Sequence, residues 1–260
     1  MRRFLCGLLV LTLLGAAAPL TARAEKVERA TPPDPKLVIR YYGHAFVYLI
    51  TTTGVRIAID PFSEDAVKYP FPPKLQADVV LVSNEADDHN GSSRLFGSPQ
   101  VFRSITAIGM NNARGFLFKG VQTYRDKDHG AQRGTNAAFT FKIDGLRFAH
   151  LGGIGHVPDA SQRQLIGPVD VLFLPVGNLD LSVAELNKIA ADLGARIIVP
   201  IKYKTPLTGD LDLRELPEFL KGTPAKVQDL HAAEFTLGPA DLPAQPTVYV
   251  LTPAPAASAQ

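Results

Sequence analysis

Residues 77–91, "ADVVLVSNEADDHNG", run from an apolar segment directly into a small polar and acidic cluster. The apolar part, residues 79–82, is continuous rather than alternating, which is typical of a strand buried on both faces. The polar part ends in Asp87, Asp88 and His89, and carboxylate and imidazole groups are common metal ligands and general bases. Functional side chains often follow the carboxyl end of a buried strand. The stretch therefore predicts a functional loop at the edge of a sheet.

Strand patterns flank this stretch along much of the chain. Two tight hairpins are predicted at Thr53-Gly54 and Asp144-Gly145, because these dipeptides favour turns between adjacent strands. Apolar runs lie on both sides of each turn. Strands are expected in residues 36–42, 45–52, 55–61, 77–83, 137–143, 146–151, 169–176 and 195–201.

Two helices are expected in the second half of the chain. In residues 182–195, Ser182 can cap the first turn and Glu185, three residues later, completes a capping box. Residues 212–222 predict a second, shorter helix that we expect Pro217 to interrupt. Hairpins followed by β-α-β units predict an α/β protein with two sheets covered by helices.

The first 24 residues have the pattern of a secretory signal peptide. Arg2 and Arg3 precede an apolar run over residues 4–18, and Ala22 and Ala24 fit a small-x-small cleavage site. The run is shorter than the ~20 apolar residues of a membrane span. We therefore expect an exported protein, periplasmic or secreted, whose only contact with a membrane would be through the signal segment if it stays uncleaved.

Removal of this segment changes the charge balance and the cysteine content. Without its three arginines, the 27 basic residues fall to 24, against 25 acidic residues, so no nucleic-acid partner is expected. Cys6, the only cysteine, lies in the same segment, which excludes disulfides and thiolate ligands from the rest of the chain. We expect a Pro-rich lead-in over residues 25–35, a single domain over 36–251, and a disordered tail over 252–260.

Five ordered segments within residues 37–206 resemble the metallo-β-lactamase fold superfamily, and most closely its lactonase-like branch, that of the ascorbate-phosphate lactonase. The resemblance implies a four-layer αββα sandwich with the active site between the sheet edges. The segments are "GHAFVYLI" (43–50, continuing to 61), "DVVLVSNEADDHNG" (78–91), "RGTNAAFTFKIDGLRFAHLGGIGH" (133–156), "GPVDVLFLPVG" (167–177) and "ARIIVPIKYKT" (195–205).

The resemblance also implies a two-metal site, but much of the ligand set is degraded. The family motif T-H-x-H-x-D-H corresponds to residues 83–89, where Asp88 and His89 match, and His150 matches a later ligand. The replaced positions are Asn84 and Ala86, where the family has histidines, Gly153, where it has a bridging aspartate, Lys202, where it has a histidine, and Arg125, where relatives often have a histidine.

These replacements weaken a metal site for clear chemical reasons. Alanine and glycine have no donor atom, and a protonated lysine has three N–H donors but no lone pair. A lysine ammonium beside a cation would repel it, so Lys202 is instead expected to pair with Asp88. Asp88, His89 and His150 remain as candidate catalytic residues and as the ligands of a metal ion, if one binds. The expected ligand-binding cleft contains His44, Asn84, Arg125 and Lys202.

Three functions are compatible with this pattern. In the first, the protein has lost dinuclear hydrolysis, needs no cofactor, and keeps its cleft for a small molecule, with an anionic one favoured near Lys202 and Arg125, or for weak activity. In the second, one zinc or other divalent ion supports hydrolysis of ester, lactone or phosphoester bonds. In the third, His89 or His150 acts as a general base without metal. Whether the chain is an enzyme, and what it binds, stays open at this point, because fold membership alone does not give an activity.

Overall fold

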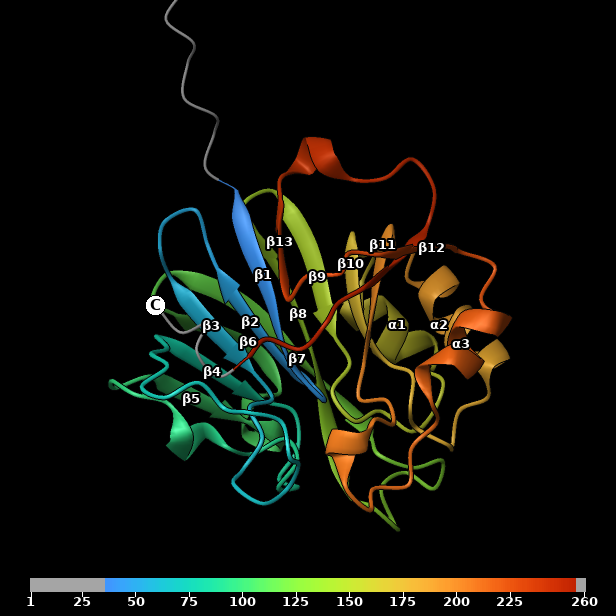
Figure 1. Cartoon of the computed structure of the whole chain (residues 1–260), viewed down its shortest axis with the longest axis horizontal. Helices are drawn as coiled ribbons and strands as arrows, with labels where there is room; N and C mark the ends of the chain where they lie inside the picture. Colours follow the sequence, from blue (N-terminus) through green and yellow to red (C-terminus); the bar gives the residue numbers. More distant parts are fainter. Residues whose placement is uncertain (1–35, 256–260) are drawn as a thin grey trace, which may run out of the picture. The chain divides into compact units, whose positions relative to one another are not determined.

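The computed structural model describes residues 36–255, apart from the side chain of Ile105, and they lie within one compact unit. The expected signal peptide and Pro-rich lead-in lie outside the described residues. Two sheets form this unit (Figure 1). The six-stranded sheet has the order β13-β1-β2-β3-β4-β5, and the eight-stranded sheet has the order β12-β14-β11-β10-β9-β8-β7-β6.

The strands of the six-stranded sheet are β1 (Leu37–Gly43), β2 (Phe46–Ile50), β3 (Arg56–Ile59), β4 (Val79–Val82), β5 (Gln100–Arg103) and β13 (Glu234–Leu237). The strands of the eight-stranded sheet are β6 (Gly109–Ala113), β7 (Phe116–Tyr124), β8 (Thr135–Ile143), β9 (Leu146–His150), β10 (Val171–Pro175), β11 (Ile197–Ile201), β12 (Lys226–Asp229) and β14 (Thr247–Val250). The helices are α1 (Ala160–Ile166), α2 (Val183–Asp192) and α3 (Leu216–Gly222), with 3-10 turns η1 (Ser92–Arg94), η2 (Ser104–Ala107), η3 (Pro206–Thr208) and η4 (Pro239–Asp241).

Alternating side chains of the first four strands pack on opposite faces of their sheet. In β4, Val79 and Leu81 join the core cluster that also contains the large side chains of the second sheet, whereas Val80 and Val82 join a separate cluster on the other face. Successive side chains in a strand point to opposite faces, so a continuous apolar run can fill both clusters. The predicted burial of this strand on both faces is confirmed.

The outer face of each sheet is covered in a different way. The three α-helices lie beside β10 and β11, on the side away from β1–β4 (Figure 1). On the six-stranded sheet the cover is instead a cluster of aromatic loop residues, in which Phe62 and Phe71 contact Phe46 of β2. The expected sandwich of two sheets is confirmed, and the loop over residues 61–78 supplies most of one outer layer.

Local sequence signals predicted two of the three helices, α2 and α3. The capping box of Ser182 and Glu185 is present at the start of α2 as predicted. Pro217 lies in the first turn of α3 and does not interrupt it, because the first turn needs no backbone N–H from that position. Helix α1 was not predicted, although Asp159 and Gln162 form a capping box at its start.

The C-terminal boundary of the domain lies beyond residue 251. Thr252 N–H donates to Ala232 O at 3.0 Å, and Ala254 N–H donates to Tyr41 O at 2.8 Å, with Ala254 fully buried. The expectation of disorder from residue 252 is therefore wrong for residues 252–255, because these backbone hydrogen bonds attach them beside β1. Residues 256–260 lie outside the described part. Among residues 36–255, no helix combines the length and apolar character needed to cross a membrane.

Candidate functional site

Polar side chains gather where the strands of both sheets end. His44 lies in the turn between β1 and β2, Asp60 follows β3, His89 lies in the loop after β4, and Lys202 follows β11. His44, Asp60 and Lys202 all have positive φ angles, of 53°, 51° and 53°. Such backbone conformations are costly for residues other than glycine and collect at functional sites. Lys202 N–H donates to His44 O at 2.6 Å, which joins the two sheets at this edge.

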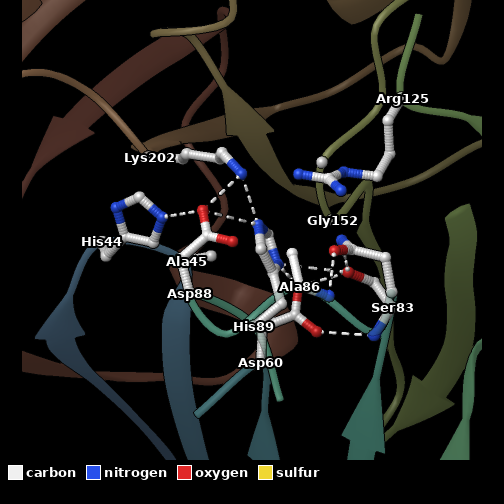
Figure 2. A network of polar contacts seen from close by, with 12 residues as sticks. His44, Ala45, Asp60, Ser83, Ala86, Asp88, His89, Arg125, Gly152 and Lys202 are labelled. Atoms are coloured by element: carbon white, nitrogen blue, oxygen red, sulfur yellow. Dashed lines mark hydrogen bonds and ion pairs between the residues drawn. The ribbon is translucent and has the colours of Figure 1, made fainter. Parts of the chain in front are cut away.

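The Lys202 ammonium lies at the centre of the site (Figure 2). Its Nζ atom is 2.8 Å from Asp88 Oδ2 and 2.6 Å from His89 Nε2. An ammonium group has only donors, so His89 accepts this hydrogen bond with the lone pair of Nε2. The side chains of Lys202 and Asp88 are only 8% and 9% exposed, so this is a buried ion pair. The predicted pairing of Lys202 with Asp88 is confirmed.

Asp60 orients the other side of the His89 ring. His89 Nδ1 is 2.7 Å from Asp60 Oδ2, and Asp60 also accepts hydrogen bonds from Ser83 N at 2.7 Å and Ser83 Oγ at 2.6 Å. In metal sites, a carboxylate commonly holds the histidine ring so that the opposite nitrogen faces the ion. Here the same arrangement presents His89 Nε2 to an ammonium.

Sequence reasoning missed Asp60, although the residue ends the strand pattern of residues 55–61 directly before Pro61. Its position at a strand end was the available signal. Burial alone would raise the pKa of Asp60, but the adjacent His89 ring and the Ser83 hydroxyl lower it overall. Asp60 therefore stays ionised beneath the site.

Asp88 is held by a second histidine. His44 Nε2 is 2.8 Å from Asp88 Oδ2, and burial lowers the pKa of His44 to about 4 despite this contact. His44 is therefore neutral near pH 7 and donates from Nε2 to the carboxylate. Burial would raise the pKa of Asp88, but His89, Lys202 and the His44 hydrogen bond together place it well below its usual range.

His150 lies beside Asp60, with 3.7 Å between His150 Nδ1 and Asp60 Oδ2, but its closer contacts are to the backbone. Its Nδ1 accepts a hydrogen bond from Gly152 N at 3.2 Å, and its Nε2 donates to Ala45 O at 3.0 Å. Burial lowers the pKa of His150, which keeps the ring neutral. Both ring nitrogens are thus used by the backbone. Of the expected ligands Asp88, His89 and His150, the structure brings together only the first two and adds His44, because the turn after β1 reaches the site.

The Asn84 amide is used to shape the loop after β4. Its Nδ2 donates to Ser83 Oγ at 3.0 Å and to Asn136 Oδ1 at 3.4 Å, and its Oδ1 accepts from Ala86 N at 3.2 Å. Asn136 also accepts from Gly153 N at 2.8 Å, so it links this loop to the segment after β9. Asn84 is buried, and its oxygen faces a backbone amide.

Arg125 reaches the site from the end of β7. Its guanidinium points toward the region between Lys202 and Gly152 in Figure 2, and Nη1 donates to Arg133 O at 3.1 Å. Burial lowers the pKa of Lys202, the Asp88 carboxylate raises it, and the positive charge of Arg125 adds to the lowering. Of the four residues predicted for the cleft, His44 and Lys202 both contact Asp88, and Asn84 and Arg125 both lie near Gly153.

Potential metal ligands are present, and the Lys202 ammonium lies against two of them. Ligand atoms of His44, Asp88 and His89 all lie within 4.8 Å of one another. However, Lys202 Nζ contacts both Asp88 Oδ2 and His89 Nε2, and His44 contacts the same carboxylate oxygen. A catalytic zinc site needs about three protein ligands and an open position for water. The side chains as they stand hold an ammonium group where an ion would lie, so they do not fit a metal ion.

Comparisons with known proteins agree with this fold. The model of the family described as "Beta-lactamase superfamily domain" matches residues 38–202. A metal-dependent hydrolase of Pyrococcus abyssi is 29% identical over 226 residues, which cover 75% of this chain and 97% of that protein. A related metal-dependent hydrolase of Geobacillus thermodenitrificans is 28% identical over 199 residues, which cover 64% of this chain and 85% of the relative.

Solved structures give the same result. A metallo-β-lactamase superfamily protein from Thermotoga maritima, described as a candidate zinc-dependent hydrolase, superposes with a TM-score of 0.66 at 29% identity, over 83% of this chain and 98% of that one. A protein from Parabacteroides distasonis shares the fold with a TM-score of 0.53 at 22% identity. The family match over most of the domain, the relatives and the two-sheet architecture establish that the chain belongs to the metallo-β-lactamase superfamily.

Proposed function

We propose that this protein is a homologue of metal-dependent hydrolases in which the Lys202 ammonium has taken the place of a metal ion. It has lost dinuclear hydrolysis and keeps its cleft for a small molecule, with at most weak activity. The observation that carries this proposal is the pair of short contacts from Lys202 Nζ to Asp88 Oδ2 and His89 Nε2. One ammonium balances the Asp88 charge and satisfies the His89 lone pair, two tasks that a cation would otherwise perform.

The remaining side chains support this interpretation. Ala86 has no donor atom, and the backbone amide of Gly153 is bound to Asn136. A metal ion in such a site would lower the pKa of a bound water and polarise a substrate oxygen, and the Lys202 ammonium can do neither as a Lewis acid because nitrogen has no vacant coordination position. His150 is neutral, buried and hydrogen-bonded at both ring nitrogens, which suits a fixed scaffold better than proton transfer. His44 is neutral and buried and holds Asp88 through Nε2, while its Nδ1 has no partner among the described residues.

Metal content tests the proposal directly. We expect the protein, expressed in zinc-supplemented medium and purified without chelators or metal-affinity resin, to contain less than about 0.1 equivalents of zinc, manganese or iron per chain, because catalytic zinc sites need about three available ligands. Elemental mass spectrometry measures this content. Near-stoichiometric metal that disappears in His89→Ala would refute the proposal, and Lys188→Met, a change on the exposed face of α2, is the matched control.

The alternative is a metal-dependent hydrolase of ester, lactone or phosphoester bonds with a remodelled mononuclear site. The names of the relatives and the grouping of His44, Asp88 and His89 favour it. It requires Lys202 to leave the position between Asp88 and His89. Stoichiometric metal in the measurement above, together with hydrolysis that depends on His44 and His89, would establish this alternative.

Export is part of the proposal and is supported by the pattern of residues 1–24. On expression of the full chain in a Gram-negative host, we expect a periplasmic product whose mass corresponds to a chain beginning at Glu25, because cleavage follows the small-x-small pattern at Ala22 and Ala24. Fractionation and intact mass measure the result. Leu13→Arg with Leu14→Arg breaks the apolar run and should retain the chain inside the cell, whereas a full-length wild-type chain in the cytosol would contradict export.

We expect neither a nucleic-acid partner nor a membrane contact beyond an uncleaved signal segment. The balance of basic and acidic residues after residue 24 supports the first expectation. The partner we propose is a small molecule bound at the edge of the two sheets.

A further inference from the structure

Gly153 lies close to three nitrogen-bearing side chains of the site. A β-carbon on Gly153 would lie 3.1 Å from Asn84 Nδ2, 3.5 Å from His89 Nε2 and 3.6 Å from Arg125 Nε. These three nearest heavy atoms are all nitrogens. The backbone of Gly153 lies outside the left-handed region, so this position does not require glycine. The neighbouring Gly152 does, since its φ is 60° and a β-carbon there would lie 2.4 Å from Ser83 Cβ.

Several N–H groups around this position have no acceptor. Lys202 uses two contacts, to Asp88 and His89, which leaves its third N–H without a hydrogen-bond partner among residues 36–255. Arg125 donates only from Nη1, so its Nε and Nη2 are equally without an acceptor within the described part of the chain. Neither residue supplies a buried atom without a partner among the described residues, so these donors can face water, and an acceptor brought by a ligand could replace that water.

The charges at this position also favour an anion. Lys202 and Arg125 point toward the same region in Figure 2, and the positive charge of Arg125 acts against that of Lys202. The Asp88 carboxylate is already paired with Lys202 and His44 through the same oxygen. An anion bound here would therefore lie between the positive charges of Lys202 and Arg125. It would not need to displace Asp88 from its ion pair with Lys202.

We propose that the position in front of Gly153 binds one carboxylate group of a small organic acid, between the Lys202 ammonium and the Arg125 guanidinium. This rests on the proposed function, because a metal ion would displace Lys202 from the site. The guanidinium fork matches the two oxygens of a carboxylate. Asp88 already balances the charge of Lys202, which leaves the single charge of Arg125 for the ligand and favours a monoanionic carboxylate over the dianionic form of phosphate.

Calorimetric titration with sodium acetate tests the site, with sodium chloride at equal ionic strength as the baseline. A ligand of four heavy atoms at a good site should give a Kd of about 1–10 mM. We expect inorganic phosphate to bind at least about tenfold more weakly than acetate. The absence of acetate binding up to about 100 mM, or tighter binding of phosphate, would overturn the carboxylate assignment.

Three variants locate the site. Gly153→Asp places a tethered carboxylate at the same position, so it should abolish acetate binding and raise the thermal midpoint. Arg125→Gln removes one charged donor and should weaken acetate binding at least about tenfold. Arg133→Gln, which removes an exposed arginine that pairs with Asp180, is the matched control and should leave the Kd within about twofold. If Gly153→Asp does not fold, the comparison of acetate binding by Arg125→Gln and Arg133→Gln tests the site. Equal Kd values for acetate in these two variants would refute it.

The two proposals fail in different ways. A protein that is free of metal but does not bind acetate would overturn the carboxylate site and leave the replacement of the metal intact. A protein with stoichiometric metal at His89 would overturn both. Metal content and acetate titration are therefore measured on the same preparation.

Discussion

Lys202→Met is expected to lower the free energy of unfolding by about 3–5 kcal/mol, because it leaves the buried Asp88 carboxylate without its charged partner. Methionine keeps most of the length of the side chain and removes only the ammonium. Asp88 would retain the hydrogen bond from His44, and His89 Nε2 would lose its donor. Urea denaturation followed by circular dichroism measures the change.

Two further variants separate the ion pair from general effects of losing a lysine. Lys188→Met removes an exposed lysine that pairs with Asp192 on α2, and it should change stability by no more than about 0.5 kcal/mol. Lys202→Met combined with Asp88→Asn removes both charges and should be more stable than Lys202→Met alone. A loss below about 1 kcal/mol in Lys202→Met would mean that the ammonium does not compensate Asp88.

Gly153→Asp combined with Lys202→His is expected to bind about one zinc ion per chain. The pair adds a carboxylate and an imidazole beside Asp88 and His89, which gives four potential ligands at one position. A β-carbon at residue 153 would already lie 3.5 Å from His89 Nε2, so the new carboxylate has the reach to share an ion with that ring. Elemental analysis after dialysis against zinc, and the rise of the thermal midpoint with zinc, measure the result.

The single variant Gly153→Asp is the control for this gain of metal. It supplies the same carboxylate but keeps the Lys202 ammonium between Asp88 and His89, so it should bind less than about 0.1 equivalents of zinc. Equal zinc binding by the single and double variants would show that Lys202 does not exclude the ion. Failure of the folded double variant to bind zinc would show that the strand ends no longer have the geometry of a metal site.

Local sequence patterns determined much of the fold. The apolar runs of residues 77–83 and 195–201 form strands, and the Ser182–Glu185 capping box begins a helix where predicted. Strands β5, β6, β7, β12, β13 and β14 were not predicted from the sequence. The residues of β12 are exposed along its whole length, so it lacks the apolar pattern of a buried strand. Strand β14, with the sequence TVYV, does carry a strand pattern that was missed.

The sequence also indicated that Lys202 and Asp88 would pair, because their chemistry and their positions after strands left few alternatives. It could not show which histidine accompanies them. His44 and His150 lie at strand ends of different sheets, and their roles depend on how the two sheets meet. In the folded structure, the His150 ring hydrogen-bonds to the backbone of Gly152 and Ala45, whereas the His44 ring hydrogen-bonds to the Asp88 side chain.

For this protein, the sequence by itself indicated the superfamily, strands β1–β4 and β8–β11, and the replacement of family ligands at Ala86, Gly153 and Lys202, because these depend on residue type and position along the chain. Only the tertiary structure decided that the ammonium lies between Asp88 and His89. Hydrogen bonds act over about 3 Å, and residues 114 and 113 positions apart come within that distance only when the two sheets pack together.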